Sequence, residues 1–294
     1  MSEEVIFTEE NGIGIITLNR PDRLNALTYP MVQKINKYLN SWEISEHINC
    51  VIIEGAGDKS FCAGGDLDWM KEQIFSDRKT RIKEATTLAN LLNKMFEFPK
   101  PLIAKVEGNA FGGGVGIISV CDIAIASENV KMALTEVKLG LIPATISPYV
   151  ISKVGANNSV NLFISAQIFS PQKAKSIGLI KSVVKEEDIN REIQKEVNPF
   201  LVNAPNAVSA SKKLVRDLST KIDQKTIKFT VEALADVWEN PEAIEGINAF
   251  FEKSVKVETQ QAVVKVVEHG NIEKLVLEVS AVCLFVCVYT LVVG

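Results

Sequence analysis

The sequence has 294 residues, and at roughly 150 residues per domain this length predicts two folded units. Hydrophobic residues make up 47% and charged residues 23%, which excludes collagen-like, coiled-coil and largely disordered chains. The net charge of −4 shows no basic surplus, so we expect no nucleic acid as a partner. The only histidines, His47 and His269, are too few for a three-histidine metal site, and we expect no metal.

The cysteines and the N-terminus indicate where the protein works. The cysteines are odd in number and lack C-x-x-C spacing, which is typical of buried, reduced thiols in a cytoplasmic protein. The first residues are acidic and have no apolar stretch, so a secretory signal is not expected. The five cysteines are Cys50, Cys62, Cys121, Cys283 and Cys287.

The first part of the chain alternates short apolar runs with amphipathic segments, which predicts an α/β sheet with crossover helices. Strands are predicted at Val5–Thr8, Ile13–Leu18, Cys50–Ile53, Leu102–Val106, Asp122–Ala126 and Met132–Leu134. Helices are predicted over Thr28–Trp42, Thr86–Phe98 and from the glycine run that ends at Gly116 to Cys121. From about Glu186 onward only helical patterns remain, at Ile189–Val202, Ala207–Leu218, Thr226–Trp238 and Pro241–Phe251.

Two glycine-rich loops follow predicted strands. The first is Ser60–Leu67 (SFCAGGDL) and the second is Gly108–Gly116 (GNAFGGGVG), which opens a helix. Neither contains a phosphate-binding signature. Each loop alone is equally explained by tight strand-to-helix packing. Together, one backbone N–H from each loop can converge on a single carbonyl oxygen and form an oxyanion hole.

Several motifs occur together in order: NRPDRLNAL from Asn19, FCAGGDLDWM from Phe61, GNAFGGGVG from Gly108 and LTEVKLGLIPATISPYV from Leu134. This combination resembles the enoyl-CoA hydratase/isomerase (crotonase) family over roughly residues 3–253. Within the family, the third and last motifs are similar to those of bacterial methylglutaconyl-CoA hydratases and their carboxygeranoyl-CoA relatives. The resemblance implies an α/β spiral of ββα units with a helical C-terminal region that drives trimerisation, often with trimers pairing into hexamers.

The resemblance also implies roles for the loops. The oxyanion hole is expected at the backbone N–H groups of Ala63 and Gly113. The first loop, which comprises Ala63, Gly64, Gly65, Asp66 and Leu67, is expected to hold the CoA adenine. Arg23, or another basic residue near Ala26, is expected to meet the CoA phosphates. Coenzyme A is part of the substrate, and no separate cofactor is expected.

The acid–base residues depart from the family pattern. Its hydratases typically use two glutamates, and here one is present as Glu136 while the other position is Gly116. A single carboxylate suffices for allylic isomerisation, and it can also serve both steps of a syn hydration. The absent side chain at Gly116 is expected to leave room for a branched acyl group or a water. Asp66, Asp68, Glu107 and Asp122 are weaker candidates for a replacement acid.

The sequence therefore predicts reversible hydration of an α,β-unsaturated acyl-CoA, with a branched substrate such as 3-methylglutaconyl-CoA. The alternatives are a Δ3,Δ2-enoyl-CoA isomerase that uses Glu136 and a non-catalytic CoA-binding protein. Cys62 lies close enough to the predicted oxyanion hole to be considered as a nucleophile, although small apolar packing explains it better. Trp69 and Met70 are expected either to line the acyl pocket or to pack the following helix.

The predicted organisation is a catalytic core at 1–190, a helical oligomerisation region at 191–253 and a Val-rich tail at 254–294. From Leu275 to Val293 the tail holds 19 residues with one charged side chain, Glu278. A helix of about 28 Å from these residues would be long enough for a membrane anchor. The other interpretations are a buried β-rich extension and a frameshifted or read-through terminus. A membrane is expected as a partner only if the tail is an anchor.

Overall fold

The computed structural model describes residues 3–219 and 221–252. By packing, the chain divides into one compact unit, Met1–Asn248, and a second, Ala249–Gly294. The fold and the candidate site lie in the first unit. The predicted tail at 254–294, with His269, Cys283 and Cys287, lies outside the described residues. Among the described residues, no helix is both long enough and apolar enough to cross a membrane.

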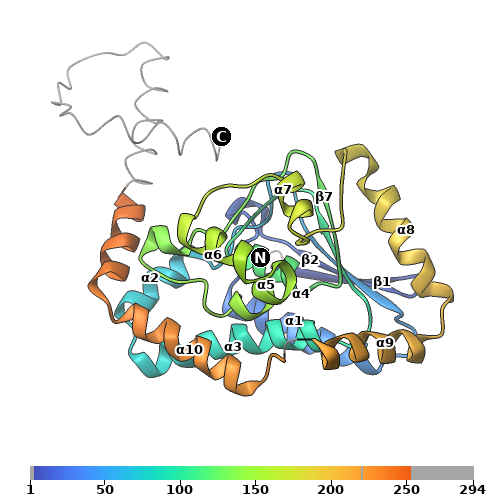
Figure 1. The fold of residues 1–294 in the computed structure, drawn as a ribbon, viewed down its shortest axis with the longest axis horizontal. Coiled ribbons are helices and arrows are strands. Elements are labelled where there is room, and N and C mark those ends of the chain that lie inside the picture. Colours follow the sequence, from blue (N-terminus) through green and yellow to red (C-terminus); the bar gives the residue numbers. More distant parts are fainter. Residues whose placement is uncertain (1–2, 220, 253–294) are drawn as a thin grey trace, which may run out of the picture. The chain divides into compact units, whose positions relative to one another are not determined.

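Two sheets organise the first unit (Figure 1). The larger sheet has the strand order β1-β2-β3-β5-β7-β9, with β1 antiparallel to β2 and every other pair parallel. Its strands are β1 Val5–Glu10, β2 Ile13–Leu18, β3 Cys50–Gly55, β5 Leu102–Val106, β7 Ile123–Ser127 and β9 Ser182–Val184. The smaller sheet is parallel, in the order β4 Ser60–Cys62, β6 Asn109–Phe111 and β8 Met132–Ala133.

The two sheets are built by the same repeating unit. Each of the pairs β3/β4, β5/β6 and β7/β8 sends its first strand to the large sheet and its second to the small one. Helices follow each pair, so the predicted spiral of ββα units is confirmed. The sequence pattern placed the residues of β4 and β6 in loops, because three-residue strands are too short to show a periodicity.

The labelled helices are α1 Tyr29–Ile44, α2 Leu67–Phe75, α3 Arg78–Glu97, α4 Gly113–Val120, α5 Ser147–Val154, α6 Ala156–Ser165, α7 Pro171–Ser176, α8 Ile189–Val202, α9 Pro205–Leu218 and α10 Gln224–Trp238. Residues 241–252 are helical as well, where a helix was predicted. Three short 3₁₀ turns are η1 Pro21–Arg23, η2 Glu136–Leu139 and η3 Glu186–Asp188. Thr28 caps α1, and Pro30 lies in its first turn as predicted. The predicted helix at Thr86 begins earlier, at Arg78, because the Asp77 carboxylate accepts a hydrogen bond from the Thr80 N–H at 2.7 Å and caps a polar first turn.

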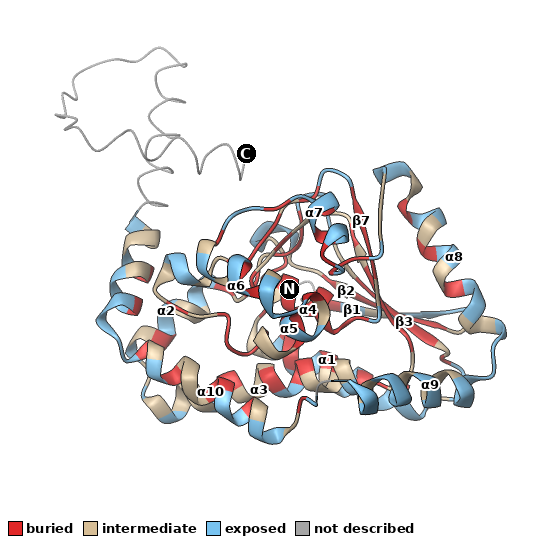
Figure 2. Cartoon of the chain, viewed as in Figure 1, coloured by how far each residue is buried: buried red, intermediate tan, exposed pale blue. Residues whose placement is uncertain are grey.

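The central strands β3, β5 and β7 of the large sheet are mostly buried, which explains their continuous apolar sequences (Figure 2). Alternate residues of β3 point to opposite sides: Val51 and Ile53 join the main core with α1, α3 and α4, while Cys50 and Ile52 pack against α8. Helix α10 packs along α3. The helices after residue 190 therefore belong to the same compact unit as the sheet, and the predicted division at 190 does not separate two packing units.

Asn25 holds together the loop that leads from β2 into α1. Its side chain is fully buried and donates hydrogen bonds to the carbonyls of Ala56 at 2.9 Å and Ser60 at 2.6 Å, while its oxygen accepts one from the Arg20 N–H. Its backbone is left-handed, with φ +55°, a conformation that asparagine adopts more readily than other side chains. This residue therefore ties the NRPDRLNAL segment to the beginning of β4.

We expect Asn25→Ala to lower the free energy of unfolding by about 2–4 kcal/mol, because the carbonyls of Ala56 and Ser60 lose their donor and alanine tolerates a left-handed φ poorly. Urea denaturation measures the loss. Asn11→Ala is the matched control, since Asn11 also has a left-handed φ of +49° but is exposed. Equal losses in the two variants would show that backbone conformation, and not the buried hydrogen bonds, accounts for the effect.

Candidate active site

The two glycine loops lie against each other at the ends of β4 and β6. A Cβ added at Gly64 would lie 3.1 Å from the Phe111 oxygen and 3.3 Å from the Gly113 nitrogen. At Gly114 an added Cβ would lie only 2.2 Å from the Cys62 oxygen. Only glycine permits this approach of two backbones, and Gly64 also has a φ of +98°. The loops are thus brought together as the sequence predicted.

The backbone donors of the first loop are not equivalent. The N–H of Ala63 donates to the Leu24 carbonyl at 3.0 Å, and that of Asp66 donates to Leu27 at 2.9 Å. The N–H of Gly65, between them, donates to no backbone carbonyl within the described part of the chain. The geometry therefore offers Gly65, rather than the predicted Ala63, as the donor from this loop.

The second loop supplies its donor at a helix start. Gly113 is the first residue of α4, and its N–H has no partner within the helix because the ladder begins one turn later. The Gly116 N–H already donates to Gly112 at 3.1 Å. A Cβ at Gly113 would lie 3.4 Å from the Gly64 Cα, so the N-terminus of α4 borders the first loop. The helix dipole places partial positive charge at this point.

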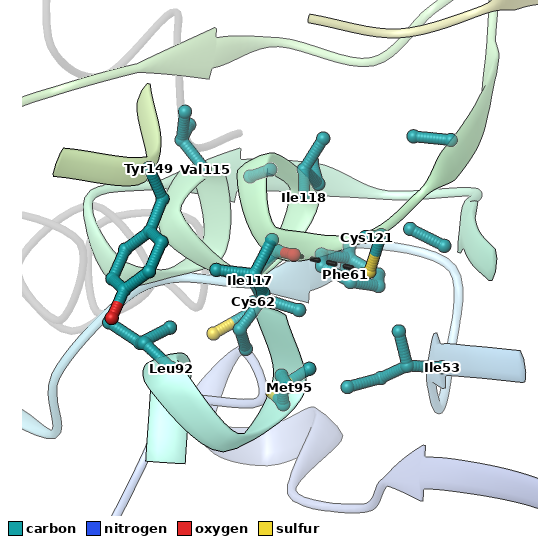
Figure 3. Close-up of a cluster of buried hydrophobic side chains, with 14 of the residues drawn as sticks. Ile53, Phe61, Cys62, Leu92, Met95, Val115, Ile117, Ile118, Cys121 and Tyr149 are labelled. Atoms are coloured by element: carbon teal, nitrogen blue, oxygen red, sulfur yellow. Dashed lines mark hydrogen bonds between the residues drawn. The ribbon is translucent and has the colours of Figure 1, made fainter. Parts of the chain in front are cut away.

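A cluster of buried apolar side chains supports the strand and the helix that carry the two loops (Figure 3). Phe61 and Cys62 of β4 pack with Val115 and Ile117 of α4 in the main core, which also contains Leu92 and Met95 of α3. Burial raises the pKa of the Cys62 thiol to about 12, so it stays protonated at neutral pH and is unsuited to act as a nucleophile. Cys50, Cys62 and Cys121 are free and buried, as predicted.

Asp66 is a structural carboxylate. It caps α2 by accepting hydrogen bonds from the N–H groups of Asp68 at 2.9 Å and Trp69 at 3.2 Å, and Arg20 pairs with it at 2.7 Å. Burial alone would raise the pKa of Asp66, but the hydrogen bonds from Arg20, Trp69 and Asp68 together lower it. Arg20 also pairs with Glu4 at 3.4 Å.

The predicted CoA-contacting side chains lie at the surface around this loop. Arg23 is half-exposed and pairs with Asp68 at 3.3 Å, and Leu67 is exposed at the start of α2. Ala26 is buried, and its carbonyl accepts a hydrogen bond from Arg20. Arg23 is thus exposed next to the loop, where the contact with CoA phosphates remains a prediction.

Glu136, at the start of η2, is the carboxylate that faces the glycine loop. A Cβ at Gly112 would lie 3.0 Å from its Oε1. Its Oε2 is buried and accepts no hydrogen bond within the described residues. Burial raises the pKa of Glu136 to about 7, while its own N–H opposes this in part. A desolvated carboxyl group with a pKa near neutrality and no structural partner suits a general acid or base.

The weaker candidates for a second acid are all engaged elsewhere. Asp122 pairs with Lys212 at 2.6 Å and accepts the Leu102 N–H at 2.7 Å. Glu107 pairs with Lys105 at 2.8 Å. Asp66 and Asp68 form the contacts described above. Glu136 is therefore the candidate that the structure leaves without a competing role.

Comparisons with known proteins agree with this geometry. The family model described as enoyl-CoA hydratase/isomerase matches residues 8–261. The chain belongs to the enoyl-CoA hydratase/isomerase family. It is similar to a short-chain-enoyl-CoA hydratase of Clostridium acetobutylicum, with 34% identity over 85% of this chain and 95% of the relative.

Two further proteins match over the same share of this chain. A crotonyl-CoA hydratase of Syntrophomonas wolfei is 30% identical, covering 85% of this chain and 96% of its own. Among solved structures, an enoyl-CoA hydratase from Shewanella pealeana has a TM-score of 0.71 at 35% identity, covering 85% of this chain and 94% of that one.

Gly116, the position where the family's hydratases typically carry a glutamate, is not an open space. A Cβ there would lie 2.3 Å from the Cγ2 methyl of Ile146, which enters from the loop before α5. The expectation that Gly116 leaves room for a branched acyl group or a water is wrong, because Ile146 fills that volume. Sequence reasoning missed this contact, since 30 residues separate the two positions and no local pattern links them.

The pair predicts a measurable coupling. We expect Gly116→Ala to destabilise the protein by about 1–3 kcal/mol through overpacking against Ile146. In Gly116→Ala/Ile146→Ala the clash is removed, so the double variant should be less destabilised than the sum of the single variants. Chemical denaturation of all four proteins gives the coupling free energy. Strict additivity would contradict the contact.

Glu136 should also make stability depend on pH. Burial raises the pKa of Glu136 from 4.5 to about 7 in the folded protein, so folding favours the protonated form. The stability that this preference contributes is fully present below about pH 4.5 and is lost as the pH rises through 7. Between about pH 5 and pH 8 we expect Glu136→Gln to gain about 2–3 kcal/mol of stability relative to the unmodified protein. Denaturation at both pH values measures this gain, and a pH-independent difference would contradict the buried, unpaired carboxylate.

Proposed function

We propose that the protein hydrates an α,β-unsaturated acyl-CoA, with Glu136 as its single acid–base residue. The observation that carries the proposal is the buried Glu136 carboxylate, which lacks a hydrogen-bond partner at Oε2 and lies beside the Gly112 backbone. The N–H groups of Gly65 and Gly113 support it: within the described residues neither donates to a backbone carbonyl, and the two loops lie against each other, so both can serve one thioester oxygen.

The proposed reaction needs one carboxylate for two proton transfers. Ionised Glu136 removes a proton from water, and the oxygen of that water bonds to Cβ of the enoyl group. The electrons of the double bond move to the thioester oxygen, where the N–H groups of Gly65 and Gly113 stabilise the enolate. Glu136 then returns the proton to Cα, which completes a syn addition and restores its carboxylate. Its pKa of about 7 suits both transfers.

The acyl group of the substrate is assigned as short. The cavity beside Gly65 has a volume of about 30 Å³, and Trp69, Val32 and Leu88 are among the residues that line it. The relatives named short-chain-enoyl-CoA hydratase and crotonyl-CoA hydratase support this assignment. The predicted 3-methylglutaconyl-CoA rests on the similarity of the LTEVKLGLIPATISPYV motif, and Ile146 removes the space that was expected for its branch at Gly116.

Isomerisation of a Δ3-enoyl-CoA is the second candidate, because one base is enough to move a proton between allylic carbons. The observation that favours it is the absence of a side chain at Gly116, which leaves Glu136 without a second carboxylate to share the work. We also infer, from the family resemblance, that the protein forms a homotrimer or homohexamer and binds the CoA portion through the first loop, Arg23 and the backbone near Ala26.

We expect Glu136→Gln to lower kcat for crotonyl-CoA hydration by about 10²- to 10⁴-fold, because no other group is placed to transfer the protons. Loss of the enoyl-thioester absorbance measures the rate, and NMR of the product distinguishes hydration from double-bond migration with a 3-enoyl-CoA. In the unmodified protein kcat/KM should rise with pH through about 7 as Glu136 ionises.

Glu128→Gln is the matched control, since Glu128 is an exposed glutamate after β7. Near-normal hydration by Glu136→Gln would remove Glu136 from the mechanism. Migration of the double bond without hydration would assign the protein as an isomerase.

A further inference from the structure

Among the residues that line the cavity beside Gly65, one side chain is charged at neutral pH. It is formed by the start of α1, by Trp69 of α2, and by Glu84, Thr87 and Leu88 of α3. Its other lining residues are Leu27, Thr28, Tyr29, Val32 and Gly65. The walls are therefore mostly apolar, and Glu84 supplies the only charge among the residues that line it.

Glu84 is held in place through one oxygen. Its Oε2 accepts hydrogen bonds from the indole N–H of Trp69 and from the Gln73 amide at 2.6 Å, and the Gln73 side chain is itself buried. No hydrogen bond to Oε1 is found within the described residues. Two N–H donors on one oxygen orient the carboxylate and leave the other oxygen available to a ligand.

Glu84 has no cationic partner among the described residues. Arg81, almost one turn earlier on the same helix, donates to the carbonyls of Gln73 at 2.9 Å and Ile74 at 3.1 Å, and its guanidinium lies over the Trp238 ring. The negative charge of Glu84 is therefore not neutralised by an ion pair, and it acts on whatever enters the cavity.

We propose that Glu84 determines which acyl groups this protein accepts, by excluding chains that end in a carboxylate and admitting neutral chains or chains that end in a hydrogen-bond donor. The proposal rests on the proposed function, because it takes the cavity beside Gly65 as the acyl pocket. A thioester oxygen bound at the Gly65 N–H directs its acyl chain into the cavity that Gly65 lines. There a terminal carboxylate would meet Glu84 with the same sign of charge and without a cation to offset it.

The consequence for substrate class is specific. A dicarboxylic acyl-CoA, such as 3-methylglutaconyl-CoA, is disfavoured, whereas a neutral short acyl-CoA is not. An amide or hydroxyl at the end of the chain could donate a hydrogen bond to the free Oε1 of Glu84.

The test uses two acyl-CoA esters of equal shape that the enzyme cannot hydrate. Glutaryl-CoA ends in a carboxylate, and glutaramyl-CoA carries the corresponding neutral amide. Their dissociation constants are measured with the full-length protein by calorimetry, so the readout does not depend on catalysis. We expect the unmodified protein to bind glutaramyl-CoA about tenfold or more tightly than glutaryl-CoA, because only the carboxylate is repelled.

Glu84→Gln should lower the dissociation constant of glutaryl-CoA about tenfold or more and change that of glutaramyl-CoA by less than about threefold. Glu72→Gln is the matched control on the exposed face of α2, and it should leave the ratio of the two dissociation constants unchanged. A ratio near one in the unmodified protein, or equal effects of the two substitutions, would overturn the role of Glu84. If Glu84→Gln does not fold, the comparison is made with Glu84→Ala, because an apolar pocket disfavours a carboxylate even without Glu84. Failure of crotonyl-CoA hydration would reject the proposed function without altering this binding comparison.

Discussion

The site depends on the contact between two backbones. Gly114 lies so close to the Cys62 carbonyl, and Gly64 to Phe111 and Gly113, that a single methyl group at either position would force the loops apart. This contact is possible because successive ββα units place β4 and β6 side by side in the small sheet. The fold thus aligns two loops that are about 50 residues apart in the sequence, and the free N–H groups of Gly65 and Gly113 follow from that alignment.

The chemistry on this framework uses few charged groups. Glu136 is buried without a hydrogen-bond partner at one oxygen, which is costly for a folded protein and is typical of a functional group. Other carboxylates nearby have structural partners: Asp66 has Arg20 and the cap of α2, and Asp122 has Lys212. Glu84 differs from all of these, because Trp69 and Gln73 hold it without neutralising it.

Much of this arrangement could be predicted from local sequence. The β2 strand at Ile13–Leu18 and the start of the helix at Thr28 both depend on neighbouring residues, and the structure has them as predicted. The short strands β4 and β6 could not be recognised, because three residues carry no periodicity. The engagement of the Ala63 N–H by Leu24 was also out of reach, since it depends on the left-handed turn at Leu24 and Asn25. The position of Ile146 and the cavity around Glu84 could not be anticipated either, because both arise from packing between segments that are distant in the sequence.

The Ile146 methyl beside Gly116 has a consequence for how such a site changes over evolutionary time. A glutamate at position 116 gained by a single substitution would lower stability, because its Cβ would overlap that methyl group. A smaller residue at 146 gained first would instead open a void in the core. In either order the one-carboxylate site is separated from a two-carboxylate site by an intermediate of reduced stability, so selection for a second acid acts only on a protein that tolerates this loss.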